Sequence, residues 1–206
     1  MLKLHGFTGS NYFNMVKMAL IEKGIEFEFV NTMPSQKDEF LVKSPMGKVP
    51  CLETDQGFIS ETDVIFDYLE ELGQGPSLMP TDAYERAKVR ELIKELELYI
   101  ELPARTCFAE AFFGGTVSEE VKEKSRANIL KGVDCIQRNA SFSPYIAGDS
   151  FTYADIMFMY TAPLAGAASK KVLDLNLTEA FPEAKPLSTL IAERDSAKQI
   201  AADQKG

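Results

Sequence analysis

The pattern of apolar residues changes once along the chain, between Gly73 and Asp82, and this change limits the folds that the chain can adopt. Before it, strand-like alternation and helical periodicity follow each other; after it, only helical periodicity is found. The boundary holds several glycine and proline residues, which is typical of an interdomain linker. We therefore predict an α/β domain over residues 1–75 and an all-helical domain over residues 83–206.

The first domain is expected to have the element order βαβ–ββα. Its opening strand, helix and second strand should form a right-handed parallel crossover. After a polar loop, a β-hairpin and a helix should complete a mixed four-stranded sheet. The expected elements are a strand at 3–5, a helix at 11–23, a strand at 25–30, a strand at 49–53 paired with one that begins at 58, and a helix over 64–72.

The second domain is expected to be a helical bundle. Thr152 and Asp155 have the spacing of a capping box, which predicts a helix start with a structural role. The tail at 199–206 is polar, and we expect it to be frayed. The expected helices are a long one over 83–113 kinked at Pro103, one over 118–140 capped by Ser118, one that begins at Thr152, and a weaker one within 182–197.

Composition excludes several classes of function. A net charge of −9 disfavours nucleic-acid binding, which depends on cationic contacts to phosphate. One histidine and three scattered cysteines without a Cys-x-x-Cys pair argue against a metal site and a disulfide framework. No apolar run is long enough for a membrane span, and residues 1–20 lack the apolar core of a signal peptide. We therefore expect a cytoplasmic protein that binds no metal, membrane or nucleic acid.

Gly47-Lys48-Val49-Pro50 places a proline at the start of a strand-like segment. Proline lacks the N–H that a central strand needs, so its position there indicates a special turn. If the Val49–Pro50 bond is cis, the main-chain N–H and C=O of Val49 face outward, where a peptide ligand can pair with them as an added strand. Taken alone, such a sequence more commonly forms an ordinary trans proline at a strand start.

Ser60-Glu61-Thr62-Asp63 opens a helix. A helix N-terminus offers unpaired N–H groups to a carboxylate, a hydroxyl adds a donor, and Glu61 can pair with an ammonium group. These groups suit a ligand that carries an ammonium and a carboxylate on one carbon. The structural alternative is plain capping, with Ser60 as N-cap and Asp63 three residues further on.

The order and spacing of these motifs resemble the glutathione transferase family, in its cytosolic, bacterial-like type, over roughly residues 1–165. The resemblance implies a thioredoxin-like N-terminal domain followed by the all-α bundle that holds the second substrate. It is carried by Leu4-His5-Gly6, Ser10, Lys23-Gly24-Ile25-Glu26-Phe27, Ser44 to Leu52, Glu61 to Glu70, and Gly148 to Asp155.

The resemblance also implies a role for each matching residue. Val49, next to Pro50, would pair its backbone with the cysteinyl part of glutathione, and Lys48 would lie near the glycyl carboxylate. Glu61 and Thr62 would hold the γ-glutamyl amine and carboxylate; threonine stands where the family usually has serine. Ser10 would activate the sulfur, with Asn11 and Tyr12 as alternatives, because Thr8 to Tyr12 matches no particular subgroup.

The implied activity is transfer of an alkyl or aryl group: glutathione, as co-substrate, attacks a small, apolar electrophile, as in detoxification. The resemblance also implies a homodimer. One alternative is a scaffold that binds glutathione without turnover. The other is a glutathione-dependent reductase or isomerase; a reductase would need a nucleophilic cysteine near the first helix start, and residues 7–14 contain none.

The remaining candidates are interpreted mainly as structural. His5 lies in the first strand, where a histidine of the core or of a sheet edge is expected rather than a catalyst. Cys51 follows Pro50 and is expected to point into the core, with a redox role as the alternative for its thiol. Three phenylalanines near the end of the long helix either pack between helices or line an apolar substrate pocket: Phe108, Phe112 and Phe113. Gln36 and Lys37 are further candidates to contact the glycyl carboxylate.

Overall fold

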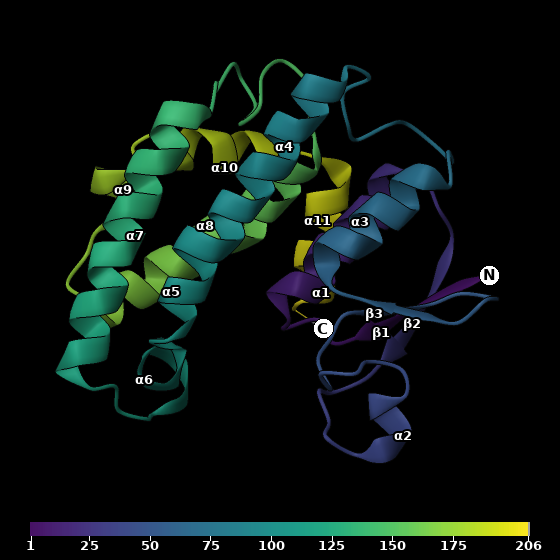
Figure 1. Ribbon diagram of the computed structural model, residues 1–206, viewed down its shortest axis with the longest axis horizontal. Helices are drawn as coiled ribbons and strands as arrows, with labels where there is room; N and C mark the ends of the chain where they lie inside the picture. Colours follow the sequence, from purple (N-terminus) through teal and green to yellow (C-terminus); the bar gives the residue numbers. More distant parts are fainter. Residues whose placement is uncertain (206) are drawn as a thin grey trace. The chain divides into compact units, whose positions relative to one another are not determined.

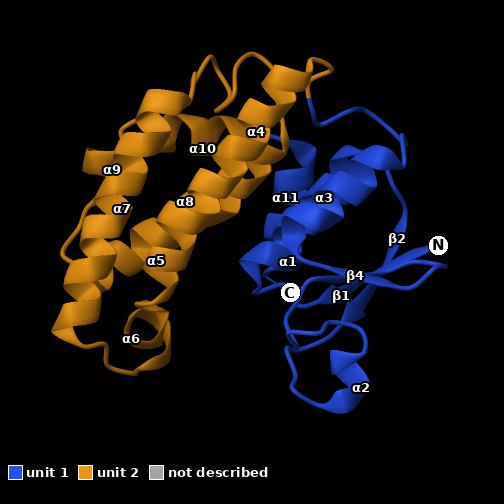
Figure 2. Cartoon of the chain, in the orientation of Figure 1, with its two compact units in different colours: residues 1–79, 193–206 blue, residues 80–192 orange. Residues whose placement is uncertain are grey.

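The computed structural model describes residues 1–205 and divides into two compact units, which Figure 2 distinguishes by colour. Unit 1 comprises Met1–Met79 together with the segment from Glu193 onward, and unit 2 comprises Pro80–Ala192. We expected one helical domain over 83–206, but its last segment groups with unit 1 instead.

Unit 1 is built on a four-stranded sheet with strand order β2-β1-β3-β4 (Figure 1). β1 runs parallel to β2 and antiparallel to β3, and β3 runs antiparallel to β4. The mixed sheet and the βαβ–ββα order are therefore confirmed. The elements are β1 (Leu2–Gly6), α1 (Asn11–Glu22), β2 (Phe27–Asn31), α2 (Asp38–Leu41), β3 (Cys51–Glu53), β4 (Phe58–Ser60) and α3 (Thr62–Glu71).

Helix α1 is the central helix of unit 1, because it packs against β1, α3 and the C-terminal helix α11 (Asp195–Asp203). Every residue from Phe13 to Leu20 is buried. This run includes two polar residues, Asn14 and Lys17. Their burial shows that α1 is covered on more sides than an ordinary amphipathic surface helix.

The tail that we expected to fray is helix α11, and the expectation was wrong because its partners lie far away in the sequence. Ile200 is 1% exposed. At one end of the helix, Arg194 Nη2 lies 2.6 Å from Glu22 Oε2; at the other end, Lys17 Nζ lies 2.6 Å from Asp203 Oδ2. Two buried apolar side chains, Ala197 and Ile200, and an ion pair at each end thus fix α11 on α1.

The stretch after α3 is also anchored within unit 1. The Lys23 ammonium, at the C-cap of α1, contacts Glu70 Oε2 at 3.1 Å and the Pro76 carbonyl at 3.0 Å. Glu70 also accepts hydrogen bonds from the Ser77 hydroxyl and the Leu78 N–H. A buried ion pair therefore holds the glycine- and proline-rich segment that we expected to act as a linker.

Unit 2 begins with the long helical stretch that we expected over 83–113, but this stretch is interrupted. Proline cannot donate to the carbonyl four residues earlier, here that of Tyr99, so the regular pattern of helical hydrogen bonds breaks. In place of one long helix kinked at Pro103, the chain thus forms a π-helical segment followed by short helices. The elements are α4 (Ala83–Glu95), the π-helix η1 (Leu96–Glu101), α5 (Leu102–Arg105) and α6 (Phe108–Phe113).

The rest of unit 2 is helical as expected, and the capping box at the start of α8 is confirmed. Asp155, which is fully buried, accepts hydrogen bonds from the N–H groups of Thr152 and Ile146, both at 2.8 Å. Beyond residue 82, the described chain contains no strand, only an isolated bridge between Tyr145 and Gly148. The helices are α7 (Glu119–Asn139), which Ser118 caps, α8 (Tyr153–Val172), α9 (Leu177–Ala180) and α10 (Ala184–Ala192).

Candidate functional site

Strand register in unit 1 brings the sequence-predicted site segments to one edge of the sheet. Cys51 is paired with His5 of β1 on one side and with Ser60 of β4 on the other. β1 and β4 therefore end at the edge where β3 begins. The segments that lie just beyond this edge are the turn into α1 with Ser10, the Val49–Pro50 step before β3, and Glu61–Thr62 after β4.

The Val49–Pro50 peptide bond is cis. Within residues 1–205, the main-chain N–H and C=O of Val49 form no hydrogen bond, although the side chain is only 9% exposed. An extended peptide laid along this step could therefore pair with both groups as an added strand.

The loop before Val49 is fixed by its own hydrogen bonds. The Ser44 hydroxyl donates to the Lys48 carbonyl at 2.8 Å and accepts from the Lys48 N–H at 3.2 Å. Gly47 has a φ of 64°, and a Cβ added there would lie 2.3 Å from the Ser35 carbonyl oxygen. The loop therefore requires glycine at this position and positions the step after Lys48.

Glu61, and not Ser60, occupies the N-cap position of α3, so the capping alternative is wrong in its details. Glu61 has a φ of 69°, a left-handed conformation that is strained for a residue with a side chain, and its side chain makes no capping hydrogen bond. The first N–H to bond within the helix is that of Ile65, to the Glu61 carbonyl at 3.0 Å. The N–H groups ahead of it are therefore oriented toward the end of the helix.

Thr62 is the first residue of α3 and directly follows the N-cap. It is 6% exposed, and within the described residues its hydroxyl makes no hydrogen bond. The Glu61 side chain is exposed and, over the same residues, takes part in no ion pair. The start of α3 therefore offers donors for an anion and, next to them, a carboxylate for a cation.

Ser10 is the N-cap of α1. Its Oγ accepts a hydrogen bond from the Phe13 N–H at 3.3 Å, so the capping role is occupied. A hydroxyl can accept one hydrogen bond and donate another, so capping leaves its proton available to a ligand. Asn11 and Tyr12, the alternative donors, are the first two residues of α1 and are half-buried.

Several cationic and amide side chains lie in the exposed loops of unit 1. Lys48 and Lys37 are both exposed. Gln36 donates its amide to the Met46 carbonyl at 3.1 Å, which ties it to the loop before Val49. Lys48 lies next to Val49 in the chain and is therefore the better placed of the two cations to reach a carboxylate of the same ligand.

His5 and Cys51 are structural. The His5 ring, 4% exposed, hydrogen-bonds Glu53 Oε2 through Nε2 at 2.8 Å, and this bond lowers the pKa of Glu53. Burial raises the pKa of the Cys51 thiol to about 11, and the thiol donates to the Lys43 carbonyl at 3.2 Å. A thiol that is protonated at neutral pH is a poor nucleophile, which argues against a redox role.

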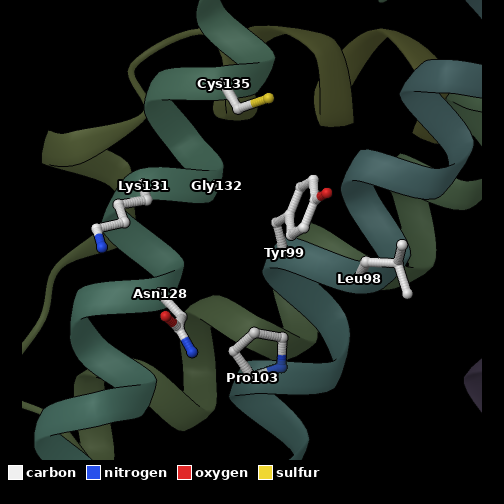
Figure 3. A pocket seen from close by; sticks show the side chains of 7 residues that line it. All are labelled: Leu98, Tyr99, Pro103, Asn128, Lys131, Gly132 and Cys135. Carbon is white, nitrogen blue, oxygen red and sulfur yellow. The ribbon is translucent and has the colours of Figure 1, made fainter.

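Unit 2 contains a pocket of about 550 Å³ between the η1–α5 segment and α7 (Figure 3). Gly132 shapes it, because a Cβ there would lie 2.5 Å from the Tyr99 carbonyl oxygen. The expected aromatic residues do not line this pocket: Phe108 is buried, whereas Phe112 is 40% and Phe113 80% exposed. The lining residues are Leu98, Tyr99, Pro103, Asn128, Lys131, Gly132 and Cys135.

Sequence reasoning missed one group of residues beside Ser10. Asn14 donates its side-chain amide to the Thr8 carbonyl at 2.8 Å, and Gln204 donates to the same carbonyl at 3.1 Å. The signal for Asn14 was an amide within the apolar run of α1. Gln204 carried no such signal, because nothing local relates residue 204 to residue 8.

Two features are absent from the part of the chain that the structure describes. No group of three or more histidine, cysteine, aspartate or glutamate side chains within residues 1–205 is arranged to hold a metal ion. No helix in the same range is both long and apolar enough to cross a membrane.

Comparison with known proteins agrees with the resemblance seen in the motifs. Residues 4–77 match the family model of the glutathione S-transferase N-terminal domain. A glutathione S-transferase of Pseudomonas putida is 53% identical over 204 residues, which cover 99% of this chain and 93% of that protein.

Solved structures share the fold over nearly the whole chain. Gtt2 from Saccharomyces cerevisiae aligns with a TM-score of 0.77 and 26% identity, covering 96% of this chain and 99% of that one. A glutathione S-transferase from Methylobacterium radiotolerans, solved in complex with glutathione sulfonate, aligns with a TM-score of 0.78 and 24% identity, covering 96% and 93%.

Proposed function

The chain belongs to the glutathione S-transferase family, and from that premise we propose that it joins the sulfur of glutathione to a small, apolar electrophile. The observation that carries the proposal is the convergence at one sheet edge of unpaired groups of Val49, an open helix start at Thr62, and the Ser10 hydroxyl. Each group matches one part of a γ-glutamyl tripeptide.

In the proposed complex, the γ-glutamyl carboxylate accepts from the Thr62 hydroxyl and the first N–H groups of α3, and Glu61 pairs with the ammonium. The cysteinyl residue pairs with the main chain of Val49, and Lys48 lies near the glycyl carboxylate. These local donors are needed because the net charge of −9 repels an anionic ligand. The 53% identical relative named glutathione S-transferase supports glutathione as the ligand.

Ser10 is proposed to stabilise the thiolate. A free thiol has a pKa of about 8.5, so only about 3% is ionised at pH 7. One charge-assisted hydrogen bond, worth about 1.5–3 kcal/mol, lowers that pKa by roughly 1–2 units, and the N-terminus of α1 adds up to about 1 kcal/mol. The proton leaves to solvent. An electron pair of the thiolate sulfur then forms the bond to the electrophilic carbon, and the leaving group departs with the electron pair of its own bond to that carbon.

We assign the electrophile to the helical unit. Phe112 and Phe113 are exposed and form an edge-to-face pair with ring centroids 6.4 Å apart, which suits an aromatic or alkyl group. A cytoplasmic homodimer with a role in detoxification completes the proposal. Replacing Phe113 with alanine should raise KM for an aromatic electrophile several-fold and leave KM for glutathione unchanged.

The proposal is tested by binding and by pH profiles. The protein should bind immobilised glutathione and conjugate it to members of an electrophile panel; binding without turnover would favour the scaffold alternative. Ser10→Ala should raise the kinetic pKa of bound glutathione by at least about one unit with little change in affinity. If Asn11→Ala or Tyr12→Phe shifts the profile instead, the role passes to that residue.

A further inference from the structure

The turn that carries Ser10 is held from outside by two side chains. The Ser10 N–H donates to the Phe7 carbonyl at 3.0 Å, which closes a four-residue turn ahead of α1. At the second position of this turn, the Thr8 carbonyl accepts from Asn14 Nδ2 at 2.8 Å and from Gln204 Nε2 at 3.1 Å. One amide comes from α1 and the other from the end of α11.

The Thr8 carbonyl belongs to the Thr8–Gly9 peptide, which is the peptide of this turn that can flip. The common four-residue turns differ mainly by a flip of the peptide between their second and third residues, and the flipped form needs a positive φ at the third residue. Gly9 occupies that third position and tolerates either form, although here it lies outside the left-handed region. Hydrogen bonds to the Thr8 carbonyl therefore select one of two conformations that the sequence permits.

The two amides are themselves fixed. Asn14 is 1% exposed, and within the described residues its Oδ1 has no hydrogen-bond partner, so its side chain is held by the donation from Nδ2 to the Thr8 carbonyl. Gln204 directly follows Asp203, which pairs with Lys17 at 2.6 Å, and the Lys17 side chain is only 8% exposed. The end of α11 is thus held against α1 at the point from which Gln204 reaches Thr8.

We propose that Gln204 is a positioning residue for thiol activation: together with Asn14 it locks the Thr8–Gly9 peptide and thereby orients the Ser10 hydroxyl. This inference rests on the proposed function, in which Ser10 meets the sulfur. Gln204 itself contacts neither glutathione nor the electrophile. Gln204 acts through the turn that carries Ser10. The C-terminal helix of unit 1 thereby contributes to thiol activation at a site formed by residues near the start of the chain.

The test compares Gln204→Ala with Gln199→Ala. Gln199 is the matched control, because it is an exposed glutamine of the same helix whose side chain makes no hydrogen bond within residues 1–205. We expect Gln204→Ala to lower kcat/KM at pH 6.5 by roughly two- to tenfold, the factor that one neutral hydrogen bond represents, and to raise the kinetic pKa of bound glutathione. KM for glutathione and the melting temperature should match those of Gln199→Ala.

A double-mutant cycle with Ser10→Ala tests whether Gln204 acts through the serine. In the Ser10→Ala background, the effect of Gln204→Ala on the pH profile should largely vanish. Equal profiles for Gln204→Ala and Gln199→Ala would overturn the inference, as would an undiminished effect without Ser10. Failure of the proposed function is recognised separately, because the wild type would then not bind glutathione, or Ser10→Ala alone would leave the profile unchanged.

Discussion

Two segments of the chain have nearly the same sequence pattern at a helix start, but only one of them forms a capping box. Ser60 to Asp63 in unit 1 and Thr152 to Asp155 in unit 2 both place a hydroxyl residue three positions before an aspartate at a helix start. In unit 2 the pattern closes on itself, since Thr152 and Asp155 satisfy each other's main-chain groups. In unit 1 the N-cap shifts to Glu61, whose φ of 69° leaves the Thr62 hydroxyl and the helix end open.

The same pattern at a helix start can therefore serve either folding or binding, depending on the chain segment that precedes the helix. Asp155 is fully buried and also accepts the Ile146 N–H, so the loop ahead of α8 completes the cap. At α3, the preceding residues belong to β4, which is paired with β3 up to Ser60. The chain then turns into the helix within one residue, and no loop remains to complete the cap.

The sharpest test of this comparison is the removal of each aspartate. Asp155→Ala should lower the free energy of unfolding by about 3–5 kcal/mol, because it leaves the buried N–H groups of Thr152 and Ile146 without partners. Asp63→Ala, the matched change in unit 1, should cost less, because Asp63 is only half-buried whereas Asp155 is fully buried. Urea unfolding measures both, and equal losses would show that the two segments are alike.

Replacement of each threonine by valine should separate the effect on glutathione binding from the effect on stability. Thr62→Val is expected to weaken glutathione binding by roughly 10- to 100-fold, the effect of losing a charge-assisted hydrogen bond of about 1.5–3 kcal/mol, with little loss of stability. Thr152→Val should lower stability by about 1–2 kcal/mol and leave affinity unchanged. Calorimetric titration with glutathione and thermal unfolding of both variants measure these effects. If Thr62→Val destabilised the protein without weakening glutathione binding, the proposed difference between the two helix starts would be wrong.

Backbone strain at Glu61 gives a smaller effect of opposite sign. Glu61→Gly should stabilise the protein by about 1 kcal/mol, because glycine adopts a positive φ without a clash, while glutathione binds more weakly for want of the carboxylate. Glu61→Ala is the control: it loses the same carboxylate but keeps the strain. A gain in stability for alanine as large as that for glycine would refute the assignment of strain.

The smallest expected effect is a pH dependence of the stability, which arises from the capping box at Thr152 to Asp155. Burial raises the pKa of Asp155 to about 6, against the opposing effect of its hydrogen bonds. An acid with a raised pKa in the folded state binds its proton more readily there than in the unfolded chain, so its contribution to stability grows as the pH falls. Between pH 7 and pH 5, wild type should gain about 1 kcal/mol relative to Asp155→Asn, as measured by urea unfolding.

Local sequence patterns predicted the elements of both units, because periodicity and capping reflect interactions within a few residues. They could not distinguish the start of α3 from that of α8, since the difference arises from strand pairing at Ser60 and from the loop at Ile146. They missed α11 for a related reason. Its stabilising partners, Glu22 and Lys17, are more than a hundred residues earlier, and no local signal reports them.

Helix α11 also has a consequence for the order in which the protein is made. Unit 1 draws on both ends of the described chain, so its first 79 residues leave the ribosome well before their last helix is synthesised. At ordinary rates of translation, unit 2 takes roughly ten seconds to follow. During that interval the face of α1 that receives Ile200 is exposed to solvent, and we expect the nascent sheet unit to stay open to chaperones until the final turn emerges.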